Sequence, residues 1–350
     1  MQKKESHLAL YRKYRPTTFK DIIGQDHIVS VLEGSLKTGN VAHAYLFYGG
    51  RGIGKTSIAR ILARELGTSD NDLTEIDAAS NNGVENIRDL REAVRVFPFD
   101  SKYKIYIFDE VHMLSKGAFN ALLKTLEEPP EHVIFMLATT ELEKVPDTIV
   151  SRCQVFTLKK PTEVILKEMV VSLAKKEGVK IDSEASELIA MLGDGSFRDT
   201  QGILQKVISI SSDEKLTRSE VERVTGAPKQ ELVFNFITSL IDENIELGFT
   251  AIAEATAQNI DMLIFMKLVL KTLRTGLLLR YAPEMKGELS LSLSESEKNF
   301  FKDALKEKKG AITSKTLVVL LDAYQNMKFA FIPQLPLEIA LVEILGNKSN

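Results

Sequence analysis

The chain contains the sequence Gly49-Gly50-Arg51-Gly52-Ile53-Gly54-Lys55-Thr56, between a short apolar run at residues 44–48 and a longer helical pattern. The spacing G-x-x-x-x-G-K-T is typical of a phosphate-binding loop, and a strand before it and a helix after it are the context that this motif requires. Glycines let backbone N–H groups turn towards a phosphate, and the start of the helix adds partial positive charge. An ordinary glycine-rich turn is the alternative, which the complete motif in this context disfavours.

Two carboxylates follow a second apolar run, residues 104–109, whose β-branched and aromatic residues predict a buried strand. Asp109 would hold Mg²⁺ through water together with the Thr56 hydroxyl, Glu110 would orient an attacking water, and Lys55 would reach the β- and γ-phosphates. Two acids at a strand end are equally well solvated loop residues when taken alone. Their pairing with the loop at residues 49–56 favours a site for ATP and Mg²⁺.

Short apolar runs alternate with helical stretches from about residue 20 to residue 158. The runs predict strands at residues 44–48, 74–77, 104–109, 133–138 and 154–158. Such alternation favours an α/β fold, with a five-stranded parallel sheet covered by helices on both faces. The helix after Lys55 should end near Gly67, and the helix before Pro129 should end where proline stops it.

The pattern changes after Pro161, where strand signals stop and the rest of the chain is predicted to be helical. A second boundary falls near Gly226. Long amphipathic stretches follow at residues 260–279 and 314–330, with a Ser/Glu/Leu-rich interruption near residues 288–298. The sequence therefore predicts three domains: an α/β domain over residues 1–160, a small helical domain over residues 161–226 and an all-helical domain over residues 227–350.

The composition is that of a soluble globular protein, with 44% hydrophobic and 27% charged residues. A net charge of −3, from 45 Lys and Arg against 48 Asp and Glu, removes the argument for nucleic-acid binding that a strongly basic chain would supply. No apolar run approaches the ~20 residues of a membrane span, and the polar N-terminus lacks a secretory signal. Cys153 is the only cysteine, as suits a reducing compartment. We expect a cytoplasmic protein with no membrane partner.

Several separate motifs resemble one known family. They are Asp109-Glu110-Val111-His112-Met113-Leu114-Ser115, the run at residues 119–130, Ser151-Arg152-Cys153, the segments 11–16 and 23–25, and residues 78–83. Together they are similar to the gamma/tau subunits of bacterial DNA polymerase III, AAA+ ATPases that drive the sliding-clamp loader. The resemblance is dense from about residue 9 to residue 210. It implies an AAA+ core with a small helical lid domain, followed by an all-α collar domain.

The resemblance implies roles for three residues outside the phosphate loop. Thr140 matches a polar sensor of the γ-phosphate or of the attacking water, with Thr139 as the less favoured neighbour. Arg198 matches a second sensor that the lid domain brings to the phosphates. Arg152 matches an arginine finger that acts on the adjacent subunit's ATP, a task that suits the permanently charged, forked guanidinium. From the residues alone, a strand end, a helix cap and a surface ion pair are the respective alternatives.

The same resemblance places the N-terminal segment against adenine. The adenine contacts would be Tyr11, Arg12, Ile23 and Gly24, and the phosphate contacts Gly49, Gly50, Arg51, Gly52, Ile53, Gly54, Lys55, Thr56 and Ser57. As pure sequence, the run of tyrosines and basic residues at 11–15 is equally a nucleic-acid patch or an amphipathic arm.

Two segments bear on zinc and on DNA. Most family members carry four cysteines that form a zinc module in the interval that residues 66–73 bridge here, so we predict that this chain binds no zinc. Residues 81–85 would begin a helix, with Asn82 as its cap and Glu85 three residues on. Such a helix start either contacts DNA phosphates or is simply well capped.

The resulting hypothesis is an ATP-hydrolysing motor subunit of the clamp loader, which opens the sliding clamp and loads it on primer–template DNA. The expected partners are delta-type and delta-prime-type subunits, copies of the chain itself in a ring, the clamp and the DNA, at the nucleoid-associated replisome. A non-hydrolysing structural subunit of the same ring is one alternative, which the presence of Lys55 and Glu110 disfavours. A ring helicase of the branch-migration type is another, disfavoured by the motifs at residues 109–130 and by the third domain.

Overall fold

The computed structural model describes residues 8–211, 215–282, 284, 287, 293–307 and 313–346. The chain folds into two compact units, one made of Met1–Leu173 with Ile189–Gln205 and the other of Ala174–Leu188 with Lys206–Asn350. The three-domain division at residues 160 and 226 stays a prediction. Within the described ranges, none of the helices combines the length and the apolar character that spanning a bilayer needs.

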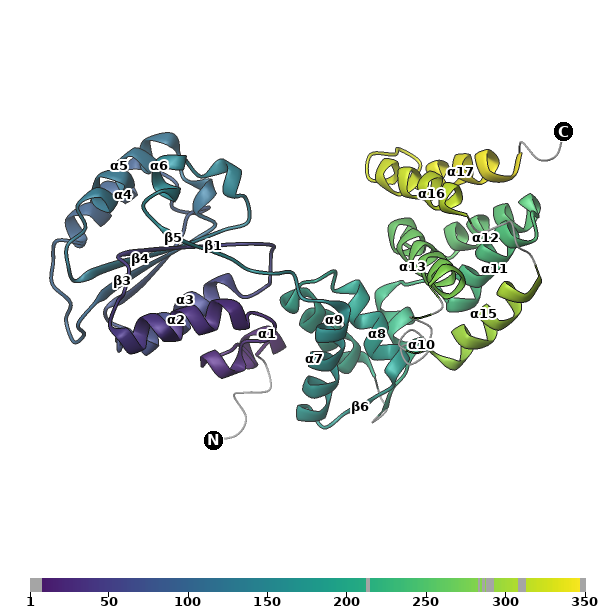
Figure 1. Cartoon of the computed structure of the whole chain (residues 1–350), viewed down its shortest axis with the longest axis horizontal. Helices are drawn as coiled ribbons and strands as arrows, with labels where there is room; N and C mark the ends of the chain where they lie inside the picture. Colours follow the sequence, from purple (N-terminus) through teal and green to yellow (C-terminus); the bar gives the residue numbers. More distant parts are fainter. Residues whose placement is uncertain are drawn as a thin grey trace. The chain divides into compact units, whose positions relative to one another are not determined.

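A five-stranded parallel sheet forms the centre of the first unit (Figure 1). Across the sheet the strands lie in the order β2-β3-β4-β1-β5. Their bounds are Ala44–Tyr48 for β1, Leu73–Asp77 for β2, Lys104–Asp109 for β3, Val133–Thr139 for β4 and Gln154–Thr157 for β5. The predicted α/β fold with five parallel strands is confirmed, and no predicted strand end is displaced by more than about one residue, within the usual scatter of such boundaries.

The central position of β1 decides where the candidate site lies. β1 pairs in parallel with β4 on one side, where Tyr48 is opposite Thr139, and with β5 on the other. In a parallel sheet the carboxyl ends of all strands meet at one edge, which is where such sheets bind their ligands. The loop after Tyr48, the acids after β3 and the threonines after β4 therefore converge at this edge.

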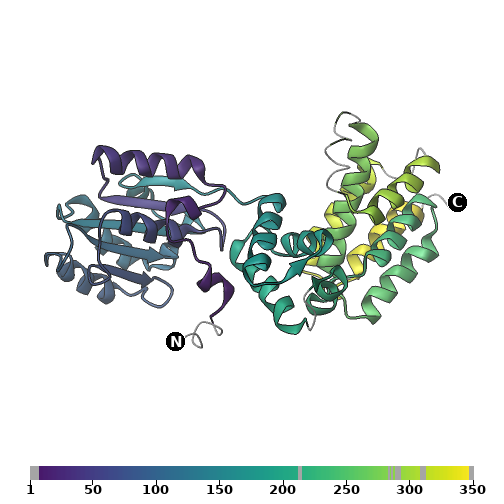
Figure 2. The same ribbon diagram turned by 90° about the horizontal axis from the view of Figure 1, so that it is seen from below.

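Helices cover both faces of the sheet (Figure 2). Side chains alternate between the faces along each strand, so Tyr45 and Phe47 pack on one side and Leu46 on the other. Because both faces are buried, the central strands are largely apolar, with polar residues at some of their ends. The helices of this part are α1 Leu10–Lys13, α2 Asp26–Thr38, α3 Lys55–Glu65, α4 Val84–Ala93, α5 Lys116–Glu127 and α6 Asp147–Val150, with 3₁₀ turns η2 Phe19–Asp21, η3 Val111–Met113 and η4 Leu142–Lys144.

Two helix ends fall where the sequence predicted them. α3 has its last helical residue at Glu65, and Gly67 takes the left-handed backbone conformation with a φ of 75°. α5 ends at Glu127, ahead of Pro129. Local chemistry alone therefore determines both stops, through glycine in one case and proline in the other.

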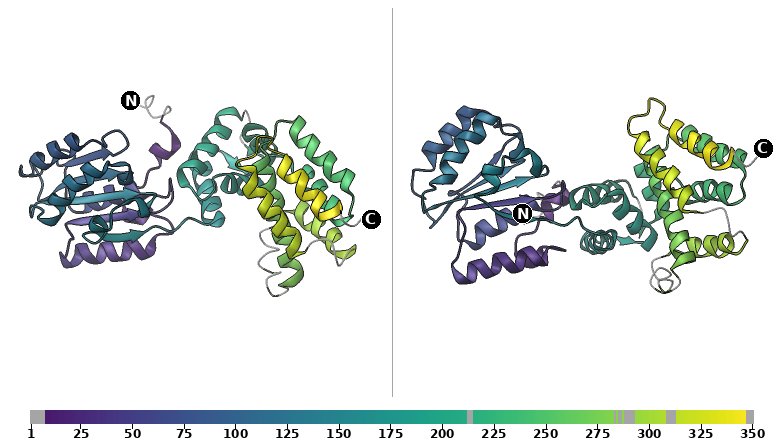
Figure 3. Two further views of the ribbon diagram at one scale, coloured as in Figure 1. Left: turned by 90° about the horizontal axis from the view of Figure 1, so that it is seen from above. Right: turned by 45° about the horizontal axis from the view of Figure 1, so that its top comes forward.

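Helices dominate the rest of the described chain (Figure 3). They are α7 Glu163–Lys176, α8 Ser183–Leu192, α9 Phe197–Ile210, α10 Arg218–Thr225, α11 Gln230–Ile241, α12 Ile245–Ala257, α13 Met262–Tyr281, α15 Glu295–Glu307, α16 Ser314–Met327 and α17 Leu335–Leu345. However, β6 Lys180–Ile181 pairs in parallel with β7 Lys215–Leu216. The prediction of a wholly helical remainder is wrong at this point, because strands of two residues are too short to produce an alternating pattern.

The long amphipathic helices are displaced slightly from their predicted ranges. α13 begins after Asp261, whose carboxylate accepts hydrogen bonds from the N–H groups of Leu263 and Ile264 at 2.8 and 3.2 Å. α16 begins at Ser314 as predicted and ends three residues earlier, at Met327. Of the predicted interruption at residues 288–298, residues 288–292 lie outside the described residues. Its last part is wrong, because α15 already begins at Glu295.

Hydrogen bonds hold the short connection between α3 and β2, at residues 66–72. Asp72 is only 1% exposed, and its carboxylate accepts the backbone N–H groups of Phe99, Asp100 and Ser101 at 2.6, 2.9 and 2.9 Å. Burial by itself raises the pKa of Asp72, but these hydrogen bonds outweigh it and lower the pKa to about 2. A buried carboxylate thus ties this connection to the segment before β3.

Replacing Asp72 should destabilise the first unit in a pH-dependent way. We expect Asp72→Ala to lower the free energy of unfolding by about 2–3 kcal/mol at pH 7, because backbone N–H groups lose their acceptor. The pKa is about 2 in the folded chain and roughly 3.9 when unfolded. The carboxylate therefore stabilises the fold fully above about pH 4, and this contribution is lost as the pH falls to about 2.

Denaturant unfolding of both proteins between pH 7 and pH 2 measures this effect. The difference between natural chain and variant should shrink over the acid range. The exposed neighbour Asp70 provides the matched control, and Asp70→Ala should change the unfolding free energy little at any pH. A pH-independent difference for Asp72→Ala would contradict the assignment.

Candidate nucleotide-binding site

The phosphate loop joins β1 to α3 and depends on glycine at several points. Gly49, Gly52 and Gly54 have φ values of 150°, 69° and 107°. Gly52 is the most confined, because a Cβ atom there would lie 2.2 Å from the Ser196 Oγ atom. No described side chain caps the start of α3, whose N-cap is Gly54. The first N–H groups of the helix therefore remain available to an anion.

Lys55 lies at the centre of this loop. Its side chain is 6% exposed, and its Nζ atom donates to the carbonyl oxygens of Gly49 and Gly50, both at 2.9 Å. Burial lowers the pKa of Lys55, while the nearby Glu110 and Asp109 carboxylates act in the opposite direction. The loop thus encloses the ammonium group. A phosphate oxygen could replace the two carbonyl oxygens as the acceptor of its hydrogen bonds.

Thr56 and Asp109 meet from different elements. The Thr56 hydroxyl, in the first turn of α3, donates to Asp109 Oδ2 at 3.0 Å, at the end of β3. The Glu110 N–H donates to the other carboxylate oxygen of Asp109 at 3.1 Å. A hydroxyl and a carboxylate are hard oxygen ligands of the kind that Mg²⁺ prefers. The two residues predicted to hold Mg²⁺ are therefore adjacent and fit such an ion.

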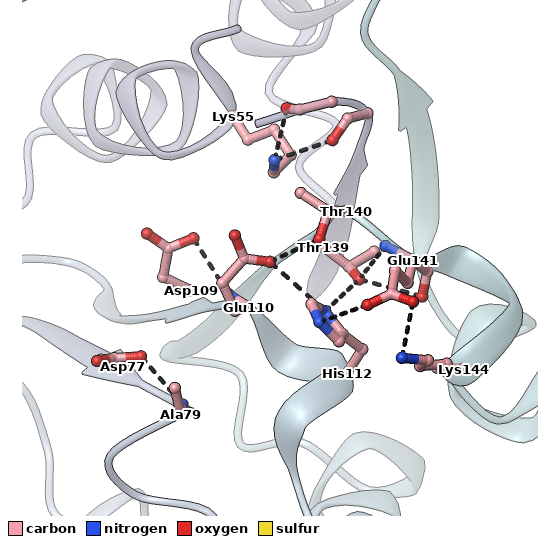
Figure 4. A network of polar contacts seen from close by, with 12 residues as sticks. Lys55, Asp77, Ala79, Asp109, Glu110, His112, Thr139, Thr140, Glu141 and Lys144 are labelled. Atoms are coloured by element: carbon pink, nitrogen blue, oxygen red, sulfur yellow. Dashed lines mark hydrogen bonds and ion pairs between the residues drawn. The ribbon is translucent and has the colours of Figure 1, made fainter. Parts of the chain in front are cut away.

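Glu110 and Thr140 are also in contact (Figure 4). The Thr140 hydroxyl donates to Glu110 Oε2 at 3.0 Å. Glu110 has the left-handed φ of 49°, which is uncommon for a residue with a side chain and is typical of functional sites held by their surroundings. The residues predicted to orient and to sense the attacking water thus lie together, although their roles stay predictions.

His112 is a component of this site that the sequence reasoning missed. Its side chain is 6% exposed, with Nδ1 3.0 Å from Thr139 Oγ1 and 3.5 Å from Glu110 Oε2. Its Nε2 lies 3.2 Å from Glu141 Oε1 (Figure 4). Thr139, set aside in favour of Thr140, thereby also borders the site. His112 stands inside the motif at residues 109–115, but no spacing rule tells which side of the turn it faces.

Arg198 lies beside the loop and against Tyr11. Its guanidinium carbon is 4.8 Å from the centre of the Tyr11 ring, which is a cation–π distance. The backbone N–H of Arg198 donates to the Gly52 carbonyl at 3.4 Å. Arg12 also approaches the Tyr11 ring, at 5.8 Å. Arg12, by hydrogen bonding and charge, and Arg198 by charge, lower the pKa of Tyr11. Arg198 thus adjoins the phosphate loop, and Tyr11, from a distant part of the chain, contacts Arg198.

Arg15 is a second residue that was missed. Its Nε donates to the Ser57 hydroxyl at 3.2 Å, and its guanidinium interacts electrostatically with the Asp109 carboxylate. Burial is the main reason that the pKa of Arg15 is lowered. Arg15 belongs to the same run of tyrosines and basic residues as Tyr11. The run could indicate that this segment lies near the site, but not that Arg15 in particular does.

Gln25 positions the neighbouring residues predicted to contact adenine. It is 1% exposed, donates from Nε2 to the Lys159 carbonyl at 2.7 Å and accepts the Lys159 N–H at 3.0 Å. These two bonds hold the segment at the end of β5. Gly24 has a φ of 73°, and Ile23 is 46% exposed. The contact of Ile23 and Gly24 with adenine stays a prediction.

Comparison with known proteins identifies the family. A family model described as "DNA polymerase III, delta subunit" matches residues 67–162. The DNA polymerase III subunit tau of Bacillus subtilis is 38% identical over 97% of this chain and 63% of its own length. The DNA polymerase III subunit gamma of Buchnera aphidicola is 40% identical over 68% of this chain and 70% of its own length. The chain belongs to the gamma/tau family of DNA polymerase III subunits.

The chain covers less than two thirds of the Bacillus subtilis relative. Among solved structures, the Thermotoga maritima RuvB Holliday junction branch migration motor is similar, with a TM-score of 0.53 and 22% identity over 65% of this chain and 79% of that chain. At that identity the likeness concerns the fold alone. The likeness agrees with the α/β core seen here, and membership of the gamma/tau family distinguishes this chain from RuvB.

Arg152, the arginine-finger position by resemblance to the gamma/tau family, lies away from the phosphate loop of its own chain. It precedes β5 and so lies towards the amino edge of the sheet, whereas the loop follows β1 at the carboxyl edge. Its guanidinium donates to the Thr148 carbonyl and to Glu127 Oε1, both at 2.8 Å. The structure therefore does not bring Arg152 together with Lys55 and Glu110.

The helix start at residues 81–85 differs from the prediction. α4 begins at Val84 with Gly83 as its N-cap, and no described side chain caps it. The Asn82 carbonyl instead accepts the Ser115 N–H at 3.1 Å. Capping by Asn82 is therefore wrong, because a contact with the start of α5, distant in the sequence, fixes the backbone of Asn82 outside the helix.

Proposed function

We propose that this gamma/tau-family chain is an ATP-hydrolysing motor subunit of a clamp loader, which opens a sliding clamp and loads it on primer–template DNA. One observation carries the proposal: Thr56 contacts Asp109, and Glu110 contacts Thr140, beside the buried Lys55. This arrangement holds the parts that phosphoryl transfer to water requires.

Each residue has a distinct task in the proposed reaction. The loop N–H groups and Lys55 bind the β- and γ-phosphates, and Thr56 with Asp109 would hold Mg²⁺. When bound, that ion neutralises charge on the phosphates. Glu110 orients and polarises the attacking water, assisted by Thr140. The Thr140 hydroxyl and the Glu110 carboxylate are 3.0 Å apart, so both can contact the same water molecule.

The proposed site is completed by an adjacent subunit. Arg198 reaches the phosphates of its own chain from beside Gly52, and Arg152 acts on the ATP of a neighbour in a ring. The helices of residues 227–350 form the collar that holds the ring, residues 161–226 form the lid and residues 1–160 form the AAA+ domain. The proposed partners are delta-type and delta-prime-type subunits, copies of the chain, the clamp and primer–template DNA in the cytoplasm, without zinc.

The two alternatives fit less well. A non-hydrolysing subunit of the ring has no use for Glu110 held in a strained conformation beside Thr140. A branch-migration motor would share the fold with RuvB. Identities of 38% and 40% to DNA polymerase III subunits favour the clamp loader over that alternative.

ATP hydrolysis with and without DNA and clamp tests the proposal. We expect weak hydrolysis by the chain alone, because Arg152 of a neighbour is missing. In a complex with delta-type and delta-prime-type subunits and clamp from the same genome, primer–template DNA should stimulate hydrolysis, whereas a blunt duplex should not. Equal hydrolysis with and without the clamp and primer–template would count against clamp loading.

A further inference from the structure

His112 lies between two carboxylates that different strands deliver. Its Nδ1 atom is 3.5 Å from Oε2 of Glu110, which follows β3, and its Nε2 atom is 3.2 Å from Oε1 of Glu141, which follows β4 (Figure 4). On the basis of the proposed ATPase function, we propose that His112 is a positioning residue, which fixes the Glu110 carboxylate for water activation by tying it to the turn at Thr139–Glu141.

Both ring nitrogens of His112 contact oxygen atoms of the turn at Thr139–Glu141. Nδ1 lies 3.0 Å from the Thr139 hydroxyl oxygen, which in turn contacts the Glu141 carbonyl at 3.2 Å and accepts the Glu141 N–H at 3.0 Å. Nε2 lies 3.2 Å from Glu141 Oε1. The ring is therefore fixed against this turn from both of its nitrogens.

A ring held in this way constrains the same oxygen of Glu110 that Thr140 contacts. Both His112 and the Thr140 hydroxyl approach the same oxygen of Glu110, at 3.5 and 3.0 Å. The left-handed backbone of Glu110 persists only if its surroundings impose it. His112 is buried, and its two ring nitrogens lie 3.0 and 3.2 Å from oxygen atoms of Thr139 and Glu141. It therefore restricts the carboxylate to one orientation.

His112 lies among charged side chains of the turn, outside the phosphate loop. The charged groups facing His112 are Glu110 and Glu141, and Lys144 pairs with the second oxygen of Glu141 at 2.7 Å. The contacts of His112 described here are with this polar turn rather than with residues 49–56, so loss of the ring should affect turnover more than nucleotide binding.

Three variants in the assembled, DNA-stimulated complex test the role. We expect His112→Phe to lower kcat about 10- to 100-fold, the cost of misplacing a reacting group, with nucleotide affinity nearly unchanged. His112→Asn keeps an N–H near the Nδ1 position and should recover most of kcat. His132→Phe is the matched control. His132 is also part-buried and lies outside this site, where its Nε2 atom is 3.1 Å from the Val94 carbonyl oxygen. It should leave kcat unchanged.

The outcomes separate this inference from the proposed function. A natural complex without ATP hydrolysis would overturn the proposed function itself. A natural complex that hydrolyses ATP, with His112→Phe equally active, would overturn the role of His112 alone. If the phenylalanine variant does not fold, His112→Asn is compared with His112→Gln, whose amide nitrogen falls near Nε2. Recovery by asparagine and not by glutamine supports contact with Glu110, and the reverse order contradicts it.

Discussion

A Glu110→Gln chain should bind ATP as tightly as the natural protein and hydrolyse it about 10²–10⁴ times more slowly, the range for loss of a positioned general base. Glutamine has the size of glutamate, so its amide oxygen can still accept the Thr140 hydroxyl that Glu110 now accepts at 3.0 Å. The negative charge that polarises water is lost. Binding groups in the loop, including Lys55, are untouched.

Titration with a fluorescent ATP analogue measures the affinity, and single-turnover hydrolysis in the assembled complex measures the chemical step. The control is Glu143→Gln, an exposed glutamate in η4, which should hydrolyse ATP at the natural rate. Unaltered turnover in Glu110→Gln would remove Glu110 from the proposed role. Loss of binding would instead show that the carboxylate holds the nucleotide.

An Arg152→Ala chain should lose about 10³–10⁵ in rate at the site that it completes on a neighbour, the range for arginine fingers. The structure supports action in trans, because Arg152 pairs with Glu127 near the amino edge of its own sheet. Its own phosphate loop lies at the carboxyl edge. The Arg152→Ala chain should therefore keep its own nucleotide site intact, and a natural neighbour can complete that site with its Arg152.

Mixed rings test that arrangement directly. Rings of Arg152→Ala chains and rings of Glu110→Gln chains should each be inactive. When the two are mixed, a Glu110→Gln chain supplies Arg152 to an Arg152→Ala neighbour with an intact Glu110, so hydrolysis should return. Arg152→Lys should recover little, because lysine lacks the fork, and Arg64→Ala, at an exposed position on α3, should remain active. Mixed rings without activity would exclude action in trans.

The sequence was most informative where local patterns suffice. The strand at residues 133–138 was predicted from its run of apolar residues, and Gly67 and Pro129 marked helix ends through their own backbone chemistry. Local rules failed for Asn82, whose capping was wrong, and for β6 and β7, which are too short to show a period. In each failure a partner distant in sequence decided the conformation.

By itself, the sequence determined the class of the fold and predicted the phosphate-binding chemistry of its central loop, because glycine spacing, Lys55 and the apolar strands are local properties. It also indicated Asp109 and Glu110 through their place after a strand. Only the tertiary structure decided which side chains meet: Arg15 with Ser57, and His112 with Glu110 and Glu141. These contacts depend on how strands and turns pack, and side-chain direction at a turn is set by that packing rather than by sequence spacing.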